Sequence, residues 1–449
     1  MDFFRNIFSA TIIKTGDFLL GGHYLNSLKE WSRYNKMSEK KLLEIQGTNL
    51  ASILTHTKNS VPFYKDFFNN RDINNDPIVL KDFPILTKSL LREQKENLIS
   101  DLFSVEKLQK NYSSGSSGLQ SFSYTEKHFK YYLQGLQTNW YTWTGYRIGD
   151  PVMQFGISPK RVFPKNFKDY FYNVHYLNSF TLNEKDLLEA SEILKKKRIE
   201  YLIGYPSAIN ELAKVLIQHN KSYPIKGIIS LGDKLFNHFK KNFDEAFQNP
   251  KINDTYGCAE GLLIACSNDY NYYYVMTPNV FVEVVDDEGN EVPDGTMGHV
   301  LITSLKNYAM PMIRYKLGDL AIKLPREKYP ENRLFQYPML EKIVGRETDV
   351  VKTLSGKTLI VHSFTGIFEF YPEIKQFKII QSSLNKITVE YILDENFKFD
   401  NTTLTEIANK IDDLTDKDLT IEFKKVDTIK NSPSGKPQII ESLIPTNEF

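Results

Sequence analysis

A short run of serines and glycines has the composition of a phosphate-binding loop. Its core is Ser113, Ser114, Gly115, Ser116, Ser117 and Gly118. Glycine lets consecutive backbone N–H groups turn toward one point, and serine adds hydroxyl donors, so such a loop can surround a phosphate. It is not a Walker loop, because Leu119 follows Gly118 where that motif requires Lys. The same composition also suits a flexible connection.

Two further segments combine aromatic, glycine and carboxylate residues. They are Tyr256-Gly257-Cys258-Ala259-Glu260 and Tyr315-Lys316-Leu317-Gly318-Asp319. We predict that both are loops beyond the carboxyl ends of strands, where α/β sheets collect their ligands. Each carboxylate also has an ordinary interpretation, Glu260 as an acidic residue at a helix N-terminus and Asp319 as a turn residue.

The charge balance and the cysteine count narrow the class of protein. The 449 residues carry 56 basic and 55 acidic side chains, which argues against a nucleic-acid-binding protein, since these usually carry a basic excess. Cys258 and Cys266 cannot form a disulfide framework, so we expect a reducing compartment and hence a cytoplasmic location. No histidine lies close to them, which favours small buried side chains over a zinc site.

The N-terminal segment, Met1 to Leu20, is apolar enough to resemble a signal sequence. Lys14 and Asp17 interrupt it, and no small-residue cleavage site follows. We predict an amphipathic helix that packs on the surface of its domain, with a membrane-surface anchor as the alternative. No other segment approaches the roughly 20 apolar residues that a membrane span needs.

The middle of the chain alternates between helix and strand. A charged, helix-like run ends at Lys110, and a short strand is expected at 122–124, on the other side of the serine loop. The pattern then predicts helices at 127–143, 183–197, 207–220 and 237–247, and strands at 152–157, 201–204, 227–231 and 252–257. Such alternation is typical of a largely parallel sheet covered by helices on both faces, so the predicted fold class is α/β.

The pattern changes after residue 280. Strands at 281–285 and 299–303 predict an antiparallel section, built as a small barrel or a packed second sheet. Gly345 to Asp349 has the composition of a linker, and the residues beyond it predict a compact α+β unit. We therefore divide the chain into a large N-terminal domain, residues 1–345, and a small, mobile C-terminal domain, residues 346–449. The length agrees with two or three domains, at about 150 residues each.

The candidate segments also occur in a recognisable order. The serine loop, Tyr256–Glu260, Tyr315–Asp319, Gly345–Asp349 and Ser434–Lys436 follow the order seen in adenylate-forming enzymes. From about residue 80 to about residue 440, the chain resembles that superfamily. Within it, the chain resembles the phenylacetate–CoA ligase-like branch, which includes the CapK proteins of capsular polysaccharide biosynthesis. The resemblance is also carried by 83–88, 204–207, 229–233 and 309–315.

This resemblance implies an ATP-dependent ligase that joins a carboxylic acid to AMP, releases pyrophosphate and passes the acyl group to an acceptor. Charge builds up at the α-phosphate in such a reaction, so positioned cations and N–H donors lower its barrier. By the same resemblance, the serine loop holds the β- and γ-phosphates, Glu260 binds Mg2+ and Asp319 accepts hydrogen bonds from the ribose hydroxyls. Mg2+ prefers carboxylate oxygens, so Glu260 suits this role.

The remaining roles are also implied by the resemblance. Arg346 would contact ribose or phosphate, and Lys436 would reach the α-phosphate and the attacking carboxylate from the small domain. The hinge between the domains would lie at Thr348 or Asp349. The residues that would line the adenine and acyl groups are Gly232, Asp233, Tyr256 and Gly257.

Three positions depart from the family pattern. Leu119 stands where relatives often have Lys, and Asp233 stands where they often have Glu. Thr348 occupies the place of a common acidic residue two positions past Arg346, with Asp349 next to it. These departures bear on ATP affinity and on which residue forms the hinge.

The acid and the acceptor stay open. CoA is the family's commonest acceptor, while an amine or hydroxyl of a sugar precursor suits the capsule-related branch. The alternative to a ligase is a nucleotide-binding relative that has lost catalysis. We expect no nucleic-acid partner and no transmembrane span.

Overall fold

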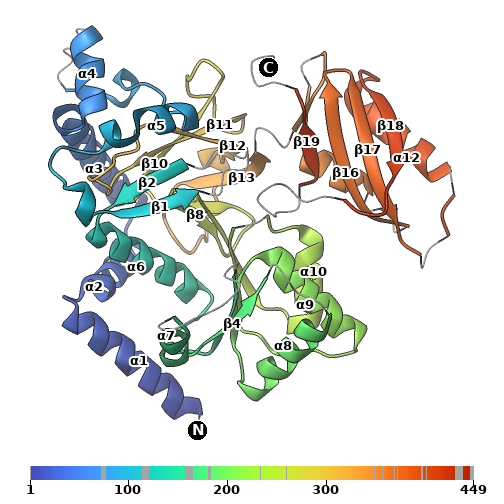
Figure 1. Cartoon of the computed structure of the whole chain (residues 1–449), viewed down its shortest axis with the longest axis horizontal. Coiled ribbons are helices and arrows are strands. Elements are labelled where there is room, and N and C mark those ends of the chain that lie inside the picture. Colours follow the sequence, from blue (N-terminus) through green and yellow to red (C-terminus); the bar gives the residue numbers. More distant parts are fainter. Residues whose placement is uncertain are drawn as a thin grey trace.

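The computed structural model describes most of the chain (Figure 1). The described residues are 2–71, 77–113, 121–156, 165–179, 184–232, 234–258, 260–346, 350–355, 357–368, 370–371, 373–395, 398–400, 402–429 and 438–444. The helices are α1 (Asp2–Leu19), α2 (His23–Tyr34), α3 (Glu39–Ser60), α4 (Pro62–Arg71), α5 (Lys88–Gln94), α6 (Lys127–Trp143), α7 (Lys165–Phe171), α8 (Glu184–Lys196), α9 (Pro206–Gln218), α10 (Asn237–Phe247), α11 (Val361–Phe368) and α12 (Thr402–Thr415). Among these, none is long and apolar enough to cross a bilayer.

The large sheet joins a parallel half to an antiparallel half. Its parallel half has the order β7-β6-β5-β3-β4 and its antiparallel half the order β10-β11-β12-β13-β9-β8, and β7 pairs with β8. The strands are β3 (Val152–Gly156), β4 (Val174–Asn178), β5 (Tyr201–Gly204), β6 (Gly227–Ser230), β7 (Lys251–Cys258), β8 (Leu262–Ser267), β9 (Tyr273–Val275), β10 (Val280–Val285), β11 (Met297–Ser304), β12 (Tyr315–Lys323) and β13 (Met339–Arg346).

Alternating residues of the parallel strands face helices on opposite sides of the sheet. Leu202 and Ile228 pack in one core with α8, α9 and α10, whereas Tyr201 and Ile229 pack in another with Tyr141 of α6. This is the period-two pattern of a strand that is buried on both faces. The predicted α/β fold class is confirmed.

The antiparallel section was predicted correctly as strands but wrongly as a separate barrel or second sheet. β8 pairs directly with the free edge of β7, in the register Tyr256↔Ala265, so the later strands extend the first sheet.

Two local predictions also need correction. Tyr315–Asp319 is not a loop but the start of β12, and Lys110 ends no helix but lies in β1 (Gln109–Ser113), paired with Tyr124 of β2 (Ser121–Thr125).

The C-terminal part has its own sheet and core. The sheet order is β18-β17-β16-β19, from Thr420–Lys425, Lys386–Leu393, Ile374–Ser383 and Ile440–Ser442, and a hairpin of β14 (Val350–Lys352) and β15 (Thr358–Ile360) precedes it. Ile379 and Val389 of the sheet pack against Ile407 and Ile411 of α12. Figure 1 shows this part set apart from the large sheet. Gly345 and Arg346 belong to β13 rather than to a linker, and the domain boundary at residue 346 stays a prediction.

A buried ion pair fixes the chain just before β12. The Arg314 guanidinium lies 3.1 and 3.3 Å from the two carboxylate oxygens of Glu283 on β10, and it donates to the carbonyl of Gly289 at 2.8 Å. Both charged side chains are buried. Burial raises the pKa of Glu283, and Arg314 opposes that shift. Each charge therefore depends on the other to offset its desolvation.

We predict that Glu283→Gln destabilises the large sheet by about 3–5 kcal/mol, because it leaves the Arg314 charge buried without a counterion. Urea denaturation followed by tryptophan fluorescence measures this, since all three tryptophans, Trp31, Trp140 and Trp143, lie in the large part. The matched control is Glu44→Gln, which breaks the exposed pair with Lys41 and should change stability by less than about 0.5 kcal/mol. Equal effects of the two substitutions would contradict the prediction.

Candidate functional site

The predicted site residues divide into those that the structure describes and those that it does not. Ser113 and Arg346 are described only as the last residues of β1 and β13. The predicted residues that lie outside the described part of the chain are Ser114, Gly115, Ser116, Ser117, Gly118, Asp233, Thr348, Asp349 and Lys436.

The serine loop connects the two strands of a hairpin. β1 and β2 pair from Gln109↔Thr125 to Ser113↔Ser121, so both ends of the loop are held by the ladder. The hairpin is tied to the large sheet through buried Ser123, whose hydroxyl donates to the backbone carbonyl of Glu260 at 2.7 Å. Asn307 adds a second tie, donating to the carbonyl of Tyr124 at 3.0 Å. The hairpin that carries the predicted phosphate loop is therefore hydrogen-bonded to the backbone of the predicted metal ligand.

Glu260 lies in the turn between β7 and β8, and only 5% of it is exposed. The Tyr315 hydroxyl, fully buried at the start of β12, donates to Glu260 Oε1 at 2.9 Å. Cys258, two residues earlier, is half-buried, and burial and then the Glu260 charge raise the pKa of its thiol. These contacts hold Glu260 as an oriented carboxylate next to the serine hairpin.

Such a carboxylate fits an Mg2+ ion. Proteins usually hold Mg2+ through one or two carboxylates together with phosphates of the substrate. Among the described residues, no group of three or more metal-ligating side chains occurs, so an all-protein cage is not seen in that part of the chain. A single buried carboxylate, Glu260, close to a loop predicted to bind phosphate, suits a Mg2+ ion that the protein and a nucleotide bind jointly.

Asp319 is oriented by Tyr256. The Tyr256 hydroxyl of β7 donates to Asp319 Oδ2 of β12 at 2.8 Å. Asp319 lies in a bulge, because His299 pairs with Leu320 whereas Leu301 pairs with Lys316, and Gly318 in the same bulge has φ +78°. Glycine takes that conformation without strain. Asp319 also pairs with Arg346 across the ladder, so two predicted nucleotide-binding residues are neighbours.

The segment that follows β6 contains Gly232 and Lys234, and Lys234 ties this segment to β13 by a hydrogen bond. Lys234 Nζ donates to the carbonyl of Val344 at 2.8 Å, at a position where β13 bulges out of register with β12. A Cβ added at Gly232 would lie 2.8 Å from the Tyr205 ring, so the backbone of this predicted adenine-binding segment runs directly against an aromatic face. Gly257, the other predicted lining glycine, lies inside β7 rather than in a loop.

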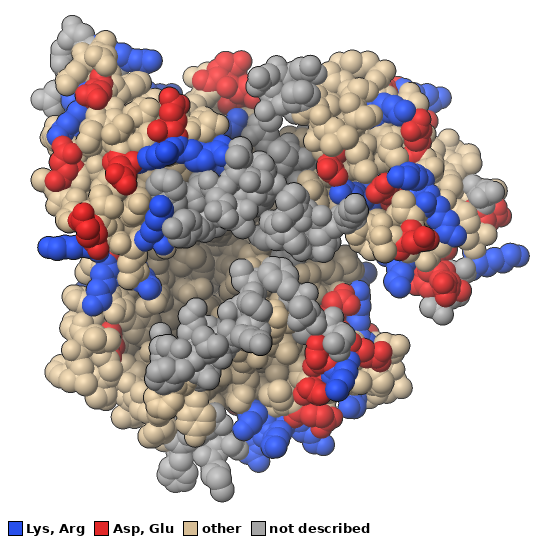
Figure 2. Space-filling model, viewed as in Figure 1, with Lys and Arg blue, Asp and Glu red and all other residues tan. Residues whose placement is uncertain are grey.

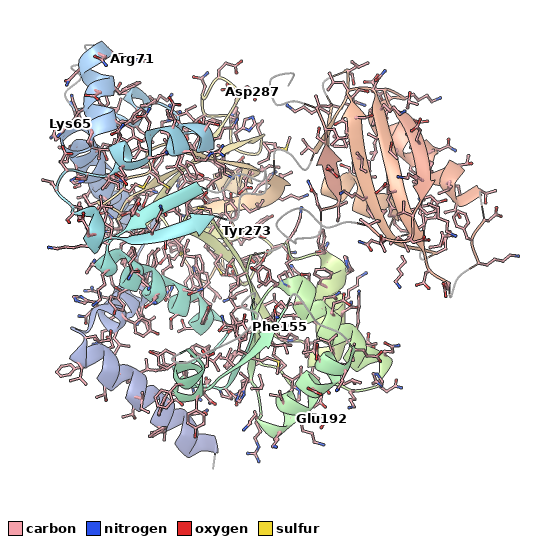
Figure 3. The ribbon with its side chains drawn as sticks, in the orientation of Figure 1. Lys65, Arg71, Phe155, Glu192, Tyr273 and Asp287 are labelled. Atoms are coloured by element: carbon pink, nitrogen blue, oxygen red, sulfur yellow. The ribbon has the colours of Figure 1, made fainter. Side chains whose placement is uncertain are left out.

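A partly buried polar cluster supports β7 where the parallel and antiparallel halves of the sheet meet. Asp254 accepts from the Ser230 hydroxyl at 2.8 Å and from the Tyr273 hydroxyl at 2.5 Å. Tyr273 lies near the middle of the molecule (Figure 3). Burial and then the Asp254 charge raise its pKa, so the phenol stays protonated and donates. This cluster fixes the strand that ends in Tyr256 and Cys258.

Sequence reasoning did not identify four residues that hold the site, namely Ser123, Tyr205, Lys234 and Tyr315. Tyr315 and Tyr205 lie within stretches that carried the family resemblance, which was a usable signal. Ser123 and Lys234 had none, because their partners, Glu260 and Val344, are more than a hundred residues away.

Family profiles match two parts of the chain. Residues 173–309 match the AMP-binding enzyme family, and residues 351–442 match the CapK C-terminal domain. Among curated proteins, phenylacetate-coenzyme A ligase of Pseudomonas putida is 32% identical over 103 residues, and that of Aromatoleum evansii is 31% identical. Each match spans 22% of this chain and 22% of the length of the relative.

Solved structures match nearly the whole chain. A 2-hydroxyisobutyryl-CoA ligase in the postadenylation state, in complex with R3-HIB-AMP, aligns with a TM-score of 0.71 at 16% identity, covering 91% of both chains. The same ligase in the thioesterification state, with 2-HIB-AMP and CoA, aligns with a TM-score of 0.58 at 17% identity, covering 92% of both chains. ATP-bound MatB from Rhodopseudomonas palustris aligns at 0.54 over 76% of this chain and 69% of its own. At these identities the matches establish the fold.

Cys258 can report the charge at Glu260. We predict that Glu260→Gln speeds alkylation of Cys258 by iodoacetamide at pH 8 by up to about tenfold, because removing the negative charge lowers the thiol pKa and raises the thiolate fraction. Mass spectrometry of the two cysteine peptides measures the rates. Cys266 is the control, since burial and Asp254 raise its pKa instead. Equal acceleration of both cysteines would mean general loosening and would contradict the prediction.

Proposed function

The chain belongs to the adenylate-forming, AMP-binding enzyme superfamily, in its phenylacetate–CoA ligase-like and CapK-like branch, and on this basis we propose that it is an ATP-dependent, AMP-forming carboxylate ligase. In the first step a carboxylate oxygen attacks the α-phosphorus of ATP, and pyrophosphate leaves to give an acyl-adenylate. In the second step a nucleophile attacks the acyl carbon, and AMP leaves.

One observation carries this proposal. Two hydrogen bonds between β12 and the β7–β8 hairpin, from Tyr315 to Glu260 and from Tyr256 to Asp319, join the segments that the family uses for nucleotide binding. Ser123 links the serine hairpin to the same place. Residues from three distant parts of the sequence thus meet beside the turn between β7 and β8, which supports a shared nucleotide site there.

Each residue has a proposed task. The serine loop, Ser113 to Gly118, would donate hydrogen bonds to the β- and γ-phosphates. Asp319 would accept from the ribose hydroxyls, held in place by the Tyr256 hydroxyl. Glu260 would hold Mg2+, and when bound this ion supplies positive charge that offsets the phosphate charge. Lys436 would donate to the α-phosphate and the attacking carboxylate, where negative charge builds up.

Gly232, Asp233, Tyr256 and Gly257 would line the adenine and the acyl group, and Arg346, paired with Asp319 across the ladder, would contact the ribose or a phosphate. Tyr205 joins this set in our proposal, because its ring lies against Gly232.

The small C-terminal domain would move between the two steps. The two states of 2-hydroxyisobutyryl-CoA ligase align with different TM-scores, 0.71 after adenylation and 0.58 during thioesterification, although nearly the same share of each chain is covered. A rotation of residues 346–449 about Thr348 or Asp349 would account for such a difference. It would bring Lys436 to the site for adenylation and withdraw it for transfer.

The thiol of CoA is the acceptor that we propose first. The relatives named above are CoA ligases, and one neighbour was solved with CoA. The match of residues 351–442 to the CapK C-terminal domain supports a second candidate, an amine or hydroxyl of a sugar precursor in surface-polysaccharide synthesis. Pyrophosphate release with aryl, fatty, amino and uronic acids would identify the acid, and adding CoA or sugar nucleotides would then identify the acceptor. Tight ATP binding without turnover of any acid would instead indicate a catalytically silent relative.

Lys436→Ala should slow adenylation by about two to three orders of magnitude, because a positioned cation at the α-phosphate is lost. The measurement is ATP–pyrophosphate exchange with the acid found in the panel. Lys425→Ala is the matched control, an exposed lysine on β18 of the same part of the chain, and should leave the rate unchanged. Near wild-type exchange in Lys436→Ala would overturn this assignment.

Glu260→Gln should lower the rate by about two orders of magnitude and raise the Mg2+ concentration that gives half the maximal rate. Tyr315→Phe keeps the carboxylate and removes only its hydrogen bond, so a smaller loss of about tenfold is expected. Pyrophosphate release measured across a range of Mg2+ concentrations compares the two. An unchanged Mg2+ dependence in Glu260→Gln would rule out a metal ligand at this position.

A further inference from the structure

Helix α1 turns three polar residues, Asn6, Ser9 and Asp17, toward the protein. Asn6 contacts Asp150 at 3.4 Å and Asn173 at 3.1 Å, and Ser9 is almost fully buried. The buried carboxylate of Asp17 caps the next helix, accepting from two backbone N–H groups at the start of α2. These contacts attach α1 to the protein through hydrogen bonds.

The opposite face of α1 turns large apolar side chains toward solvent. Ile7 and Phe18 are eleven residues apart, as are Phe8 and Leu19, which is close to three helical turns, so all four lie on one side of α1. Phe18 and Leu19 are 78% and 76% exposed. Leu20, directly after the helix, is also exposed. A surface helix of a water-soluble domain normally shows the reverse arrangement.

Helix α7 extends this apolar face. Phe8 of α1 and Phe171 of α7 have ring centroids 6.2 Å apart, and the two helices lie side by side in Figure 1. On α7, Phe167 and Tyr170 are also exposed. We call Ile7, Phe8, Phe18, Leu19, Leu20, Phe167 and Tyr170 the α1–α7 surface. In Figure 2 the lower left of the molecule, over α1, shows almost no charged side chains.

The charge that accompanies this surface is positive. Within residues 6–20, Lys14 lies on the exposed face together with the apolar residues, whereas Asp17, the acidic residue of that segment, is buried on the other face. An apolar face that carries a cation and aromatic rings matches the boundary of an anionic bilayer, where acyl chains take the apolar side chains and headgroups take the cation.

We propose that the α1–α7 surface docks this protein on an anionic lipid bilayer, with α1 lying in the plane of the membrane. Large exposed apolar patches are rare on soluble monomers, and here two helices from different parts of the chain meet at the Phe8–Phe171 contact and both expose large apolar side chains. The surface is separate from the nucleotide site and does not rest on the proposed enzymatic function.

Flotation of the full chain with lipid vesicles tests the proposal. Wild-type protein should float with phosphatidylcholine vesicles that contain phosphatidylglycerol, and the bound fraction should fall as salt is added. The double variant Phe18→Ser/Leu19→Ser should lower the vesicle partition coefficient by about tenfold or more, because two side chains no longer enter the bilayer. Lys14→Glu should weaken binding to the anionic vesicles by about fivefold or more and barely change binding to pure phosphatidylcholine.

The matched control is Leu102→Ser, which changes a leucine that is equally exposed but lies outside the α1–α7 surface, and it should bind as wild type does. Failure of wild-type protein to float would overturn the proposal, as would equal binding by the double variant. Sedimentation velocity tests the alternative that a second copy of the chain binds this surface. A concentration-dependent dimer that the double variant loses, without vesicle binding by either protein, would assign the surface to a second copy of the chain.

Discussion

The contact between Arg314 and Glu283 is the constraint on which the rest of the site depends. Arg314 adopts φ +49°, a left-handed conformation that a non-glycine residue seldom takes without support. Its side chain supplies that support by pairing with Glu283, while its backbone N–H donates to Thr303 and its carbonyl accepts from Leu86. The backbone N–H and carbonyl of Arg314 and its guanidinium are therefore all hydrogen-bonded. The next residue, Tyr315, begins β12 with its hydroxyl already directed at Glu260.

A single strand then sets the relation between the two carboxylates. Tyr315 and Asp319 are four positions apart on β12, and both reach the segment from Tyr256 to Glu260. The Tyr315 hydroxyl donates to Glu260, and the Asp319 carboxylate accepts from the Tyr256 hydroxyl. The bulge at Gly318 lies between them and shifts the register of β12 against β11. Because both contacts share one strand and one hairpin, a shift of β12 would disturb both carboxylates together, which explains why buried ionic and polar contacts concentrate at its start.

The sequence predicted the parts of the fold that local patterns encode. Helix and strand alternate at periods that single segments reveal, and the serine loop is recognisable from its own six residues. The pairing between strands could not be predicted from such local patterns. Nothing in Leu262–Ser267 states that this strand adds to the edge of β7, and that one pairing decides between an extended sheet and a separate barrel. The strand at Tyr315–Asp319 was mistaken for a loop because Gly318 and Asp319 are typical turn residues, whereas the structure uses them in a bulge.

Local sequence patterns also could not predict how α1 is oriented on the protein. That orientation relates the α1–α7 surface to the serine hairpin. Periodicity predicts an amphipathic helix but not which face meets the protein, since that depends on Asp150, Asn173 and the start of α2. α2 in turn packs closely on α6, where a Cβ at Gly135 would lie 2.6 Å from the Cβ of Ser27. α6 follows directly from β2, the strand that closes the serine hairpin. A continuous packed path therefore connects the α1–α7 surface to the serine hairpin, so docking of one would fix the orientation of the other relative to the bilayer.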